Sequence, residues 1–199
     1  MFFIKYRIKI TQFLGTILLL LILFSHKNLE DIPVIADIIF ICGITLVGIG
    51  TIGRIWCALY ISGYKDRILI QSGPYSICRH PLYFFSLLGG LGIGLATETL
   101  TIPVIILIGF ILFYPLLMNH EEKSLSKTFG KEFQSYSQRT PKFFPKFSLF
   151  NMPEECTVST KVFTRALIRS FFFIWMIGLL ELIEGIQQSG AVPALFSLY

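Results

Sequence analysis

Five hydrophobic stretches separated by short polar segments dominate the chain, and each is a candidate membrane helix. A spanning helix needs about 20 mostly apolar residues, because its backbone groups must bond internally across the hydrocarbon. The stretches cover approximately residues 8–24, 33–60, 81–97, 99–119 and 166–186. This pattern predicts an all-α integral membrane protein with about five transmembrane helices in a single membrane domain, residues 1–199.

The first and last stretches each allow a second interpretation. Three basic residues precede the first stretch, as in a signal peptide, but no small-residue cleavage site follows Phe24, so we expect an uncleaved helix. The last stretch predicts an additional C-terminal hydrophobic helix over residues 162–186. Its uncharged centre, residues 170–180, is short enough for an interfacial or re-entrant helix, whereas snorkelling of Arg169 would let the helix span.

The third and fourth stretches are joined only by residues 96–98, which predicts a tight antiparallel hairpin. Within the third, Ser86, Gly90 and Gly94 recur every four residues and would let another backbone or a flat ligand approach closely; we expect helix packing. The run 89–94 contains a GxGxG pattern. No strand precedes it and no acidic residue follows at the ribose-binding distance, so a dinucleotide site is not predicted.

Composition and charge agree with a membrane chain. Hydrophobic residues make up 54% of the sequence and charged residues 15%, which is too apolar for a soluble domain. With a cytoplasmic N-terminus, all of the 17 Lys and Arg residues except Lys27 fall on the cytoplasmic side. Topology therefore accounts for the net charge of +5 and no nucleic-acid partner is needed. The 4 cysteines form no CxxC pair and have no histidine at metal-ligand spacing, so no metal site is expected.

Two polar stretches, residues 63–81 and 119–145, break the hydrophobic pattern on the predicted inner face. In the first, Pro81 suits the opening turn of the third helix, where its missing N–H costs nothing. Free N–H groups and the positive dipole end of that helix, supplemented by Arg79, would hold a carboxylate or phosphate. The alternative is that Arg79 is only a topological anchor and His80 a helix cap.

The second polar stretch begins with paired carboxylates, Glu121 and Glu122, at the inner end of the fourth helix. They could bind a cationic amino or sulfonium group, or a ribose, but a solvated charge run ending a membrane helix explains them equally well. Apolar and aromatic residues then fall close to one helical face and predict an amphipathic interfacial helix: Leu125, Phe129, Phe133 and Tyr136.

These separated blocks together resemble a known superfamily. The matching blocks are residues 69–75 with Gly73-Pro74-Tyr75, Arg79-His80-Pro81-Leu82-Tyr83, Glu121-Glu122, and 139–145. Their order and spacing are similar to those of the isoprenylcysteine carboxyl methyltransferase and phospholipid methyltransferase superfamily. The resemblance marks residues 57–146 as a methyltransferase-like cofactor-binding core and leaves the first, second and last helices largely uncovered.

The resemblance implies an integral-membrane methyltransferase that uses S-adenosylmethionine at the cytoplasmic face and a lipophilic or lipid substrate from the bilayer. The cofactor-binding residues that it implies are Ile68, Leu69, Ile70, Tyr75, Arg79, His80, Pro81, Leu82, Tyr83, Glu121 and Glu122. Among them, residues 68–70 would line the adenosine pocket and Glu121 would meet the polar end of the cofactor. A catalytic base stays unassigned; an amine acceptor would need one, and Glu122 or His120 could serve.

One departure from the superfamily concerns the substrate, and two other functions stay open. An arginine that meets the substrate carboxylate in the isoprenylcysteine enzymes is replaced here by Leu117, which puts that substrate in doubt. NADPH-dependent membrane sterol reductases share a similar pattern, but they have Asn before the tyrosine where this chain has Leu82 before Tyr83. A non-catalytic membrane protein that retains the fold is the other alternative.

Overall fold

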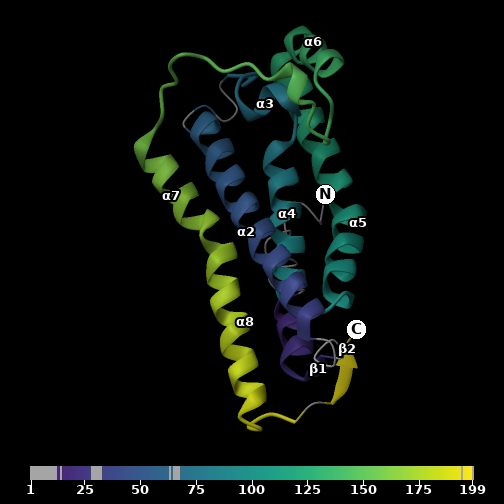
Figure 1. The fold of residues 1–199 in the computed structure, drawn as a ribbon. Coiled ribbons are helices and arrows are strands. Elements are labelled where there is room, and N and C mark those ends of the chain that lie inside the picture. Colours follow the sequence, from purple (N-terminus) through teal and green to yellow (C-terminus); the bar gives the residue numbers. More distant parts are fainter. Residues whose placement is uncertain are drawn as a thin grey trace.

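The computed structural model describes residue 13 and residues 15–27, 33–62, 64, 68–193 and 195–198, which form an elongated bundle of helices (Figure 1). Residues 15–23 are helical. The helices that follow are α2 (Pro33–Ile61), α3 (Pro74–Ile77), α4 (Pro81–Leu95), α5 (Thr101–Phe129), α6 (Lys131–Arg139), the 3-10 helix η2 (Phe147–Leu149), α7 (Thr160–Ser170) and α8 (Phe172–Gln188). Two short strands, β1 (Ser25–Lys27) and β2 (Phe196–Leu198), pair in parallel. The expectation of an all-α membrane protein is confirmed, and the strand pair is an unpredicted addition.

Three helical stretches are long and apolar enough to cross a membrane: α2, α5, and α7 together with α8, each 29 residues long. Their outer surfaces carry exposed apolar side chains such as Ile52 and Trp175, as expected where lipid replaces water. The 15 residues of α4 are shorter and extend only about 22 Å. Of the predicted first helix, residues 8–12 and 14 lie outside the described residues.

Glycines allow α2, α4 and α5 to pack closely. A Cβ added to Gly50 of α2 would lie 2.6 Å from the backbone nitrogen of Gly89, and one added to Gly92 would lie 2.6 Å from a carbonyl oxygen of α2. On another face of α4, a Cβ on Gly94 would lie 2.8 Å from the backbone of α5. Gly94 belongs to the predicted small-residue stripe, so its use in helix packing is confirmed. Gly89 and Gly92 form a second small-residue face of α4, which packs against α2.

The predicted hairpin between the third and fourth stretches is confirmed. Helix α4 ends at Leu95 and α5 begins at Thr101. The Thr97 hydroxyl donates to the carbonyl oxygen of Gly94 at 2.7 Å, and Glu98 turns the chain with a φ of 55°. The backbone N–H of Thr97 donates to the same carbonyl at 3.3 Å, so both groups of Thr97 close the end of α4.

The predictions for the end of the fourth helix were wrong in two respects. Helix α5 continues ten residues beyond residue 119, to Phe129. The predicted single amphipathic helix is broken at Gly130, whose φ of 51° is accessible to glycine and ends α5 before α6 begins. The aromatic face survives this break, because residues of both helices pack around the buried Leu69: Leu125, Phe129, Phe133 and Tyr136.

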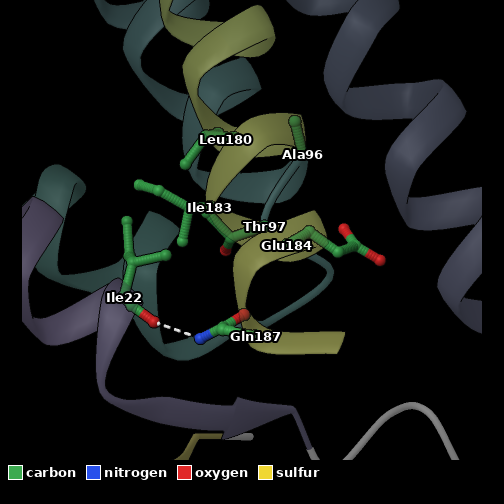
Figure 2. A pocket seen from close by; sticks show the side chains of 7 residues that line it. All are labelled: Ile22, Ala96, Thr97, Leu180, Ile183, Glu184 and Gln187. Carbon is green, nitrogen blue, oxygen red and sulfur yellow. Dashed lines mark hydrogen bonds between the residues drawn. The ribbon is translucent and has the colours of Figure 1, made fainter. Parts of the chain in front are cut away.

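The C-terminal helix predicted over residues 162–186 begins two residues earlier, at Thr160, and a single turn residue, Phe171, separates α7 from α8. At the far end of α8, the Gln187 side-chain amide donates to the carbonyl oxygens of Ile22 and Ser25, both at 2.9 Å. Gln187 thereby ties the end of α8 to the last turn of the first helix and to the start of β1. Figure 2 shows the small pocket at this contact, which is lined by Ile22, Ala96, Thr97, Leu180, Ile183, Glu184 and Gln187.

Candidate functional site

The two polar stretches meet at the end of the bundle where α3 and α6 lie (Figure 1). The turn before α3 needs glycine, because Gly73 has a φ of 59° and a Cβ there would lie 2.3 Å from the ring of Tyr60. After α3 the backbone N–H of Arg79 donates to the carbonyl oxygen of Pro141 at 2.9 Å, and that of His80 donates to Lys142 at 3.2 Å. These two bonds hold the entry of α4 against the segment that follows α6.

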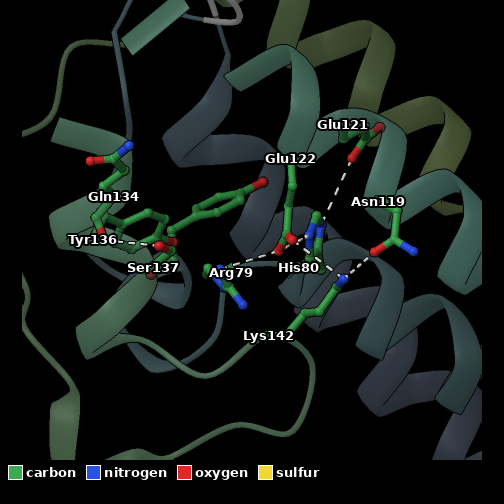
Figure 3. A network of polar contacts seen from close by, with 10 residues as sticks. Arg79, His80, Asn119, Glu121, Glu122, Gln134, Tyr136, Ser137 and Lys142 are labelled. Carbon is green, nitrogen blue, oxygen red and sulfur yellow. Dashed lines mark hydrogen bonds and ion pairs between the residues drawn. The ribbon is translucent and has the colours of Figure 1, made fainter. Parts of the chain in front are cut away.

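Glu122 lies at the centre of a polar network (Figure 3). Its Oε1 atom is 3.4 Å from an Arg79 guanidinium nitrogen and 3.2 Å from Nε2 of His80, and its Oε2 atom is 3.3 Å from Nζ of Lys142. Two cations therefore flank this carboxylate, whose side chain is 18% exposed. The network joins the start of α4, the C-terminal half of α5 and the segment after α6.

Glu121 has different surroundings. The Tyr83 hydroxyl donates to Oε1 of Glu121 at 2.7 Å, whereas Oε2 is 3.8 Å from Nδ1 of His80. The ring of Tyr83 packs edge-to-face against that of Tyr114, with ring centres 5.2 Å apart. With 39% of its side chain exposed, Glu121 remains accessible to a ligand.

His80 is buried between the two carboxylates. It occupies the N-cap position of α4, but its side chain makes no capping hydrogen bond, so the cap interpretation was wrong. Burial lowers the pKa of His80 below its usual value, against the opposing effect of the hydrogen bond and charge of Glu122. The ring is consequently neutral at pH 7.

Beside this network lie buried polar atoms with no partner. The Tyr136 hydroxyl donates to the backbone carbonyl of Tyr75 at 2.7 Å, but the Tyr75 hydroxyl and Nε of Arg79 are buried without a hydrogen bond. Burial raises the pKa of both tyrosines, so both hydroxyls stay protonated and can donate. Unpaired buried polar groups are costly and are commonly completed by a ligand or water.

The structure brings together most of the predicted site residues, with differences in exposure. Arg79, His80, Tyr83, Glu121 and Glu122 share the polar network. Leu69 is buried against α6, while Ile70 and Leu82 pack around the buried Tyr75, and Pro81 is buried as the first residue of α4. Ile68 differs from these residues, because its side chain is 54% exposed.

Sequence reasoning missed Lys142 and Asn119 as members of the network. Nζ of Lys142 donates to Oδ1 of Asn119 at 2.5 Å in addition to its contact with Glu122. Both residues lie in the polar stretch already singled out. Their roles depend on the backbone pairing between residues 79–80 and 141–142, which no local pattern indicates.

Within the part of the chain that the structure describes, no group of three or more His, Cys, Asp or Glu side chains is placed to hold a metal ion. The four cysteines are free thiols. Cys57 and Cys78 are buried, and Cys42 and Cys156 are exposed.

The fold and the site agree with a comparison of the chain against known protein families. Residues 34–132 match the phospholipid methyltransferase family. This range begins in α2 and ends just inside α6, so it includes the polar network apart from Lys142. The chain belongs to the phospholipid methyltransferase family, which is part of the isoprenylcysteine carboxyl methyltransferase-like superfamily of integral-membrane methyltransferases. The resemblance inferred from the sequence is thereby confirmed.

Two relatives extend the similarity over nearly the whole chain. The chain is 36% identical over 197 residues to the cobalt-zinc-cadmium resistance protein CzcN of Cupriavidus metallidurans, covering 99% of this chain and 90% of that protein. It is also 36% identical over 192 residues to the nickel-cobalt-cadmium resistance protein NccN of Alcaligenes xylosoxydans xylosoxydans, covering 96% and 89%. No solved structure matches the chain.

Proposed function

We propose that this membrane methyltransferase transfers a methyl group from S-adenosylmethionine to a lipophilic acceptor at the polar network between α4 and α5. The observation that carries the proposal is the placement of Glu121 and Glu122 against the start of α4, within a chain of a methyltransferase family. We further propose that this end of the bundle is cytoplasmic, because basic residues lie in α6 and beside α3 and α6: Arg79, Lys131, Arg139, Lys142 and Lys146.

The residues at this site suit the functional groups of S-adenosylmethionine. Glu121 is accessible and offers a carboxylate to the ammonium group. Arg79 carries a buried Nε without a partner and lies near the start of α4, so it is placed for the carboxylate group of the same molecule. Tyr75 offers a buried hydroxyl, and residues 68–70 supply apolar side chains for the adenosine part.

Methyl transfer makes modest chemical demands on the protein. When bound, S-adenosylmethionine would supply an electrophilic methyl carbon, whose bond to sulfur breaks and leaves its electron pair on sulfur as the acceptor's lone pair forms the new bond. The protein then has to hold the two reactants in line at near-attack distance. Tyr83 holds Glu121 from α4, and Arg79, His80 and Lys142 hold Glu122, so both carboxylates have fixed positions.

A lipophilic acceptor follows from the location of the site. The network lies at the end of helices whose outer surfaces are apolar, with Leu116 61% exposed on α5 only five residues before Glu121. An acceptor dissolved in the bilayer can therefore place its polar head at the network while its hydrocarbon chain remains in lipid.

The names of the two relatives connect those proteins with resistance to cobalt, zinc, nickel and cadmium. We propose that this chain acts in the same setting, by modifying a membrane constituent. Deletion of its gene from the native host should raise sensitivity to cadmium, and wild type but not Glu121→Gln should restore growth. Equal restoration by both would separate any resistance from methyl transfer.

The direct test of methyl transfer is an activity assay in membranes. Membranes containing the wild-type chain are incubated with S-adenosylmethionine labelled in its methyl group, and the label in the organic extract is counted. We expect time-dependent labelling of extractable material, reduced at least tenfold by Glu121→Gln and unaffected by Glu155→Gln in an exposed loop. Labelling no higher than in membranes without the protein would contradict the proposal.

A further inference from the structure

Arg54 is an arginine within the apolar helix α2 and lacks an acidic partner among the residues that the structure describes. It lies seven residues before the end of α2, about 10 Å along the helix axis. Its guanidinium group donates to the hydroxyl of Ser86 on α4 and lies 5.4 Å from the ring centre of Phe173 on α8. Its Nε atom is buried and unbonded.

This arrangement leaves most of the hydrogen-bonding capacity of Arg54 unused. A guanidinium group has five N–H donors in a planar fork, and the serine hydroxyl and the aromatic ring engage only part of it. A charged side chain inside a membrane segment is costly, and such residues usually pair with an opposite charge or mark a binding site. An anion would meet this unused capacity.

Arg54 also lies close to the proposed methyl-transfer site. Ser86 is three residues after Tyr83 on α4, about 4.5 Å along the axis, and Tyr83 donates to Glu121. The ring of Tyr114 on α5 packs against the ring of Tyr83. Because Ser86 and Tyr83 lie one turn apart on α4, an acceptor whose reacting group lies at Glu121 can extend along the helix toward the Arg54 guanidinium.

We propose that Arg54 binds an anionic group, carboxylate or phosphate, in the polar head of the methyl acceptor, so that the acceptor is an anionic amphiphile. This inference rests on the proposed function. The planar fork of arginine matches two oxygens of either group, and burial of Nε strengthens such a pair relative to one in water. Ser86 fixes the guanidinium in position from α4, and the apolar surface around α2 accommodates the chain of the amphiphile.

The test uses purified full-length protein in a neutral detergent and three probes with the same hydrocarbon chain: dodecanoate, dodecyl phosphate and uncharged dodecanol. We expect the wild type to bind at least one anionic probe about tenfold more tightly than dodecanol, as expected for a charge-assisted pair. The two anionic probes distinguish a carboxylate-bearing from a phosphate-bearing acceptor. Calorimetry measures the affinity for each probe. Partitioning of a probe into the detergent is the same for all variants, so it does not affect the comparison between them.

Three variants complete the test. Arg54→Gln should abolish the anionic preference, and Arg54→Lys, which keeps the charge, should retain part of it. Arg169→Gln removes an exposed charge from the end of α7 and should behave as the wild type. Equal wild-type affinity for anionic probes and dodecanol would overturn the inference without any variant, as would a full preference in Arg54→Gln. S-adenosylmethionine is titrated into the same samples, and its failure to bind the wild type would contradict the proposed function instead.

Discussion

The adjacent residues Glu121 and Glu122 illustrate how position alone divides the work of two identical side chains. Glu122 is enclosed by Arg79, His80 and Lys142, whereas Glu121 has the Tyr83 hydroxyl as its close partner and remains accessible. Glu122 is therefore suited to holding the site together, and Glu121 to meeting a ligand.

Glu121→Gln should weaken S-adenosylmethionine binding about tenfold, because it removes one charge-assisted hydrogen bond to the ligand. The Tyr83 hydroxyl can still donate to the amide oxygen, so the fold should be retained. Calorimetry on detergent-solubilised protein measures the affinity, and the exposed Glu155→Gln is the matched control. An unchanged affinity in Glu121→Gln would remove this residue from the cofactor site.

His80 predicts a dependence of stability on pH. Its folded pKa is lowered from 6.5, so the unfolded chain binds more protons below that value. The neutral ring therefore contributes fully to the free energy of unfolding above pH 6.5. This contribution is lost as the pH falls through the lowered pKa of His80. The melting temperature should therefore decrease between about pH 7.5 and about pH 5.5, and less steeply in His80→Gln. The same slope in both proteins would show that other groups cause it.

At this scale the sequence predicted the charged members of the polar network better than their partners. Arg79, His80 and the two glutamates could be found because charged residues at helix ends stand out in an apolar chain. Lys142 and the Arg54–Ser86 contact could not, because they depend on which segments far apart in the sequence become neighbours.

At the level of elements, the close packing of α2 against α4 supports the start of α4, where His80 and Arg79 lie. Gly92→Ala should destabilise the protein by about 1 to 3 kcal/mol, because the added Cβ would lie 2.6 Å from an α2 carbonyl oxygen and force the helices apart. Gly109→Ala on α5 is the control, since its Cβ meets nothing within 4 Å. Thermal unfolding in detergent compares the two, and equal melting temperatures would contradict this packing.

The elements could be predicted wherever a local pattern determined them. The hairpin between α4 and α5 followed from a short polar connection, and Pro81 indicated where α4 begins. The break at Gly130 was missed because the aromatic spacing continues across it, and the side chains of α6 reach the same buried face after the turn. The pairing of β1 with β2 was missed because each strand has only three residues.

For the whole molecule, the arrangement of α7 and α8 predicts that the two ends of this segment lie on opposite sides of the membrane. Cys156 is exposed before α7, and Leu195 is 70% exposed after α8, near β1 and at the other end of the bundle (Figure 1). In a Cys42→Ser background, an impermeant maleimide should label Cys156 only from the cytoplasmic side. A second variant carries Leu195→Cys and Cys156→Ser in the same background. The maleimide should label its new thiol at position 195 only from the opposite side of the membrane.

Labelling of both positions from one side would show that α7 and α8 do not cross the membrane, although the polar network between α4 and α5 would be unaffected. The sequence left this question open because the uncharged centre of the segment is short. The structure lengthens the helical stretch to 29 residues and makes a crossing possible by length.

The most direct test of the account is a calorimetric titration of the purified wild-type chain with S-adenosylmethionine, and in parallel with NADPH. We predict saturable binding of S-adenosylmethionine and no binding of NADPH, because the network offers carboxylates to a cationic ligand. Binding of NADPH alone would place the chain among the reductases, and binding of neither by a folded sample would contradict the assignment of this network as a cofactor site.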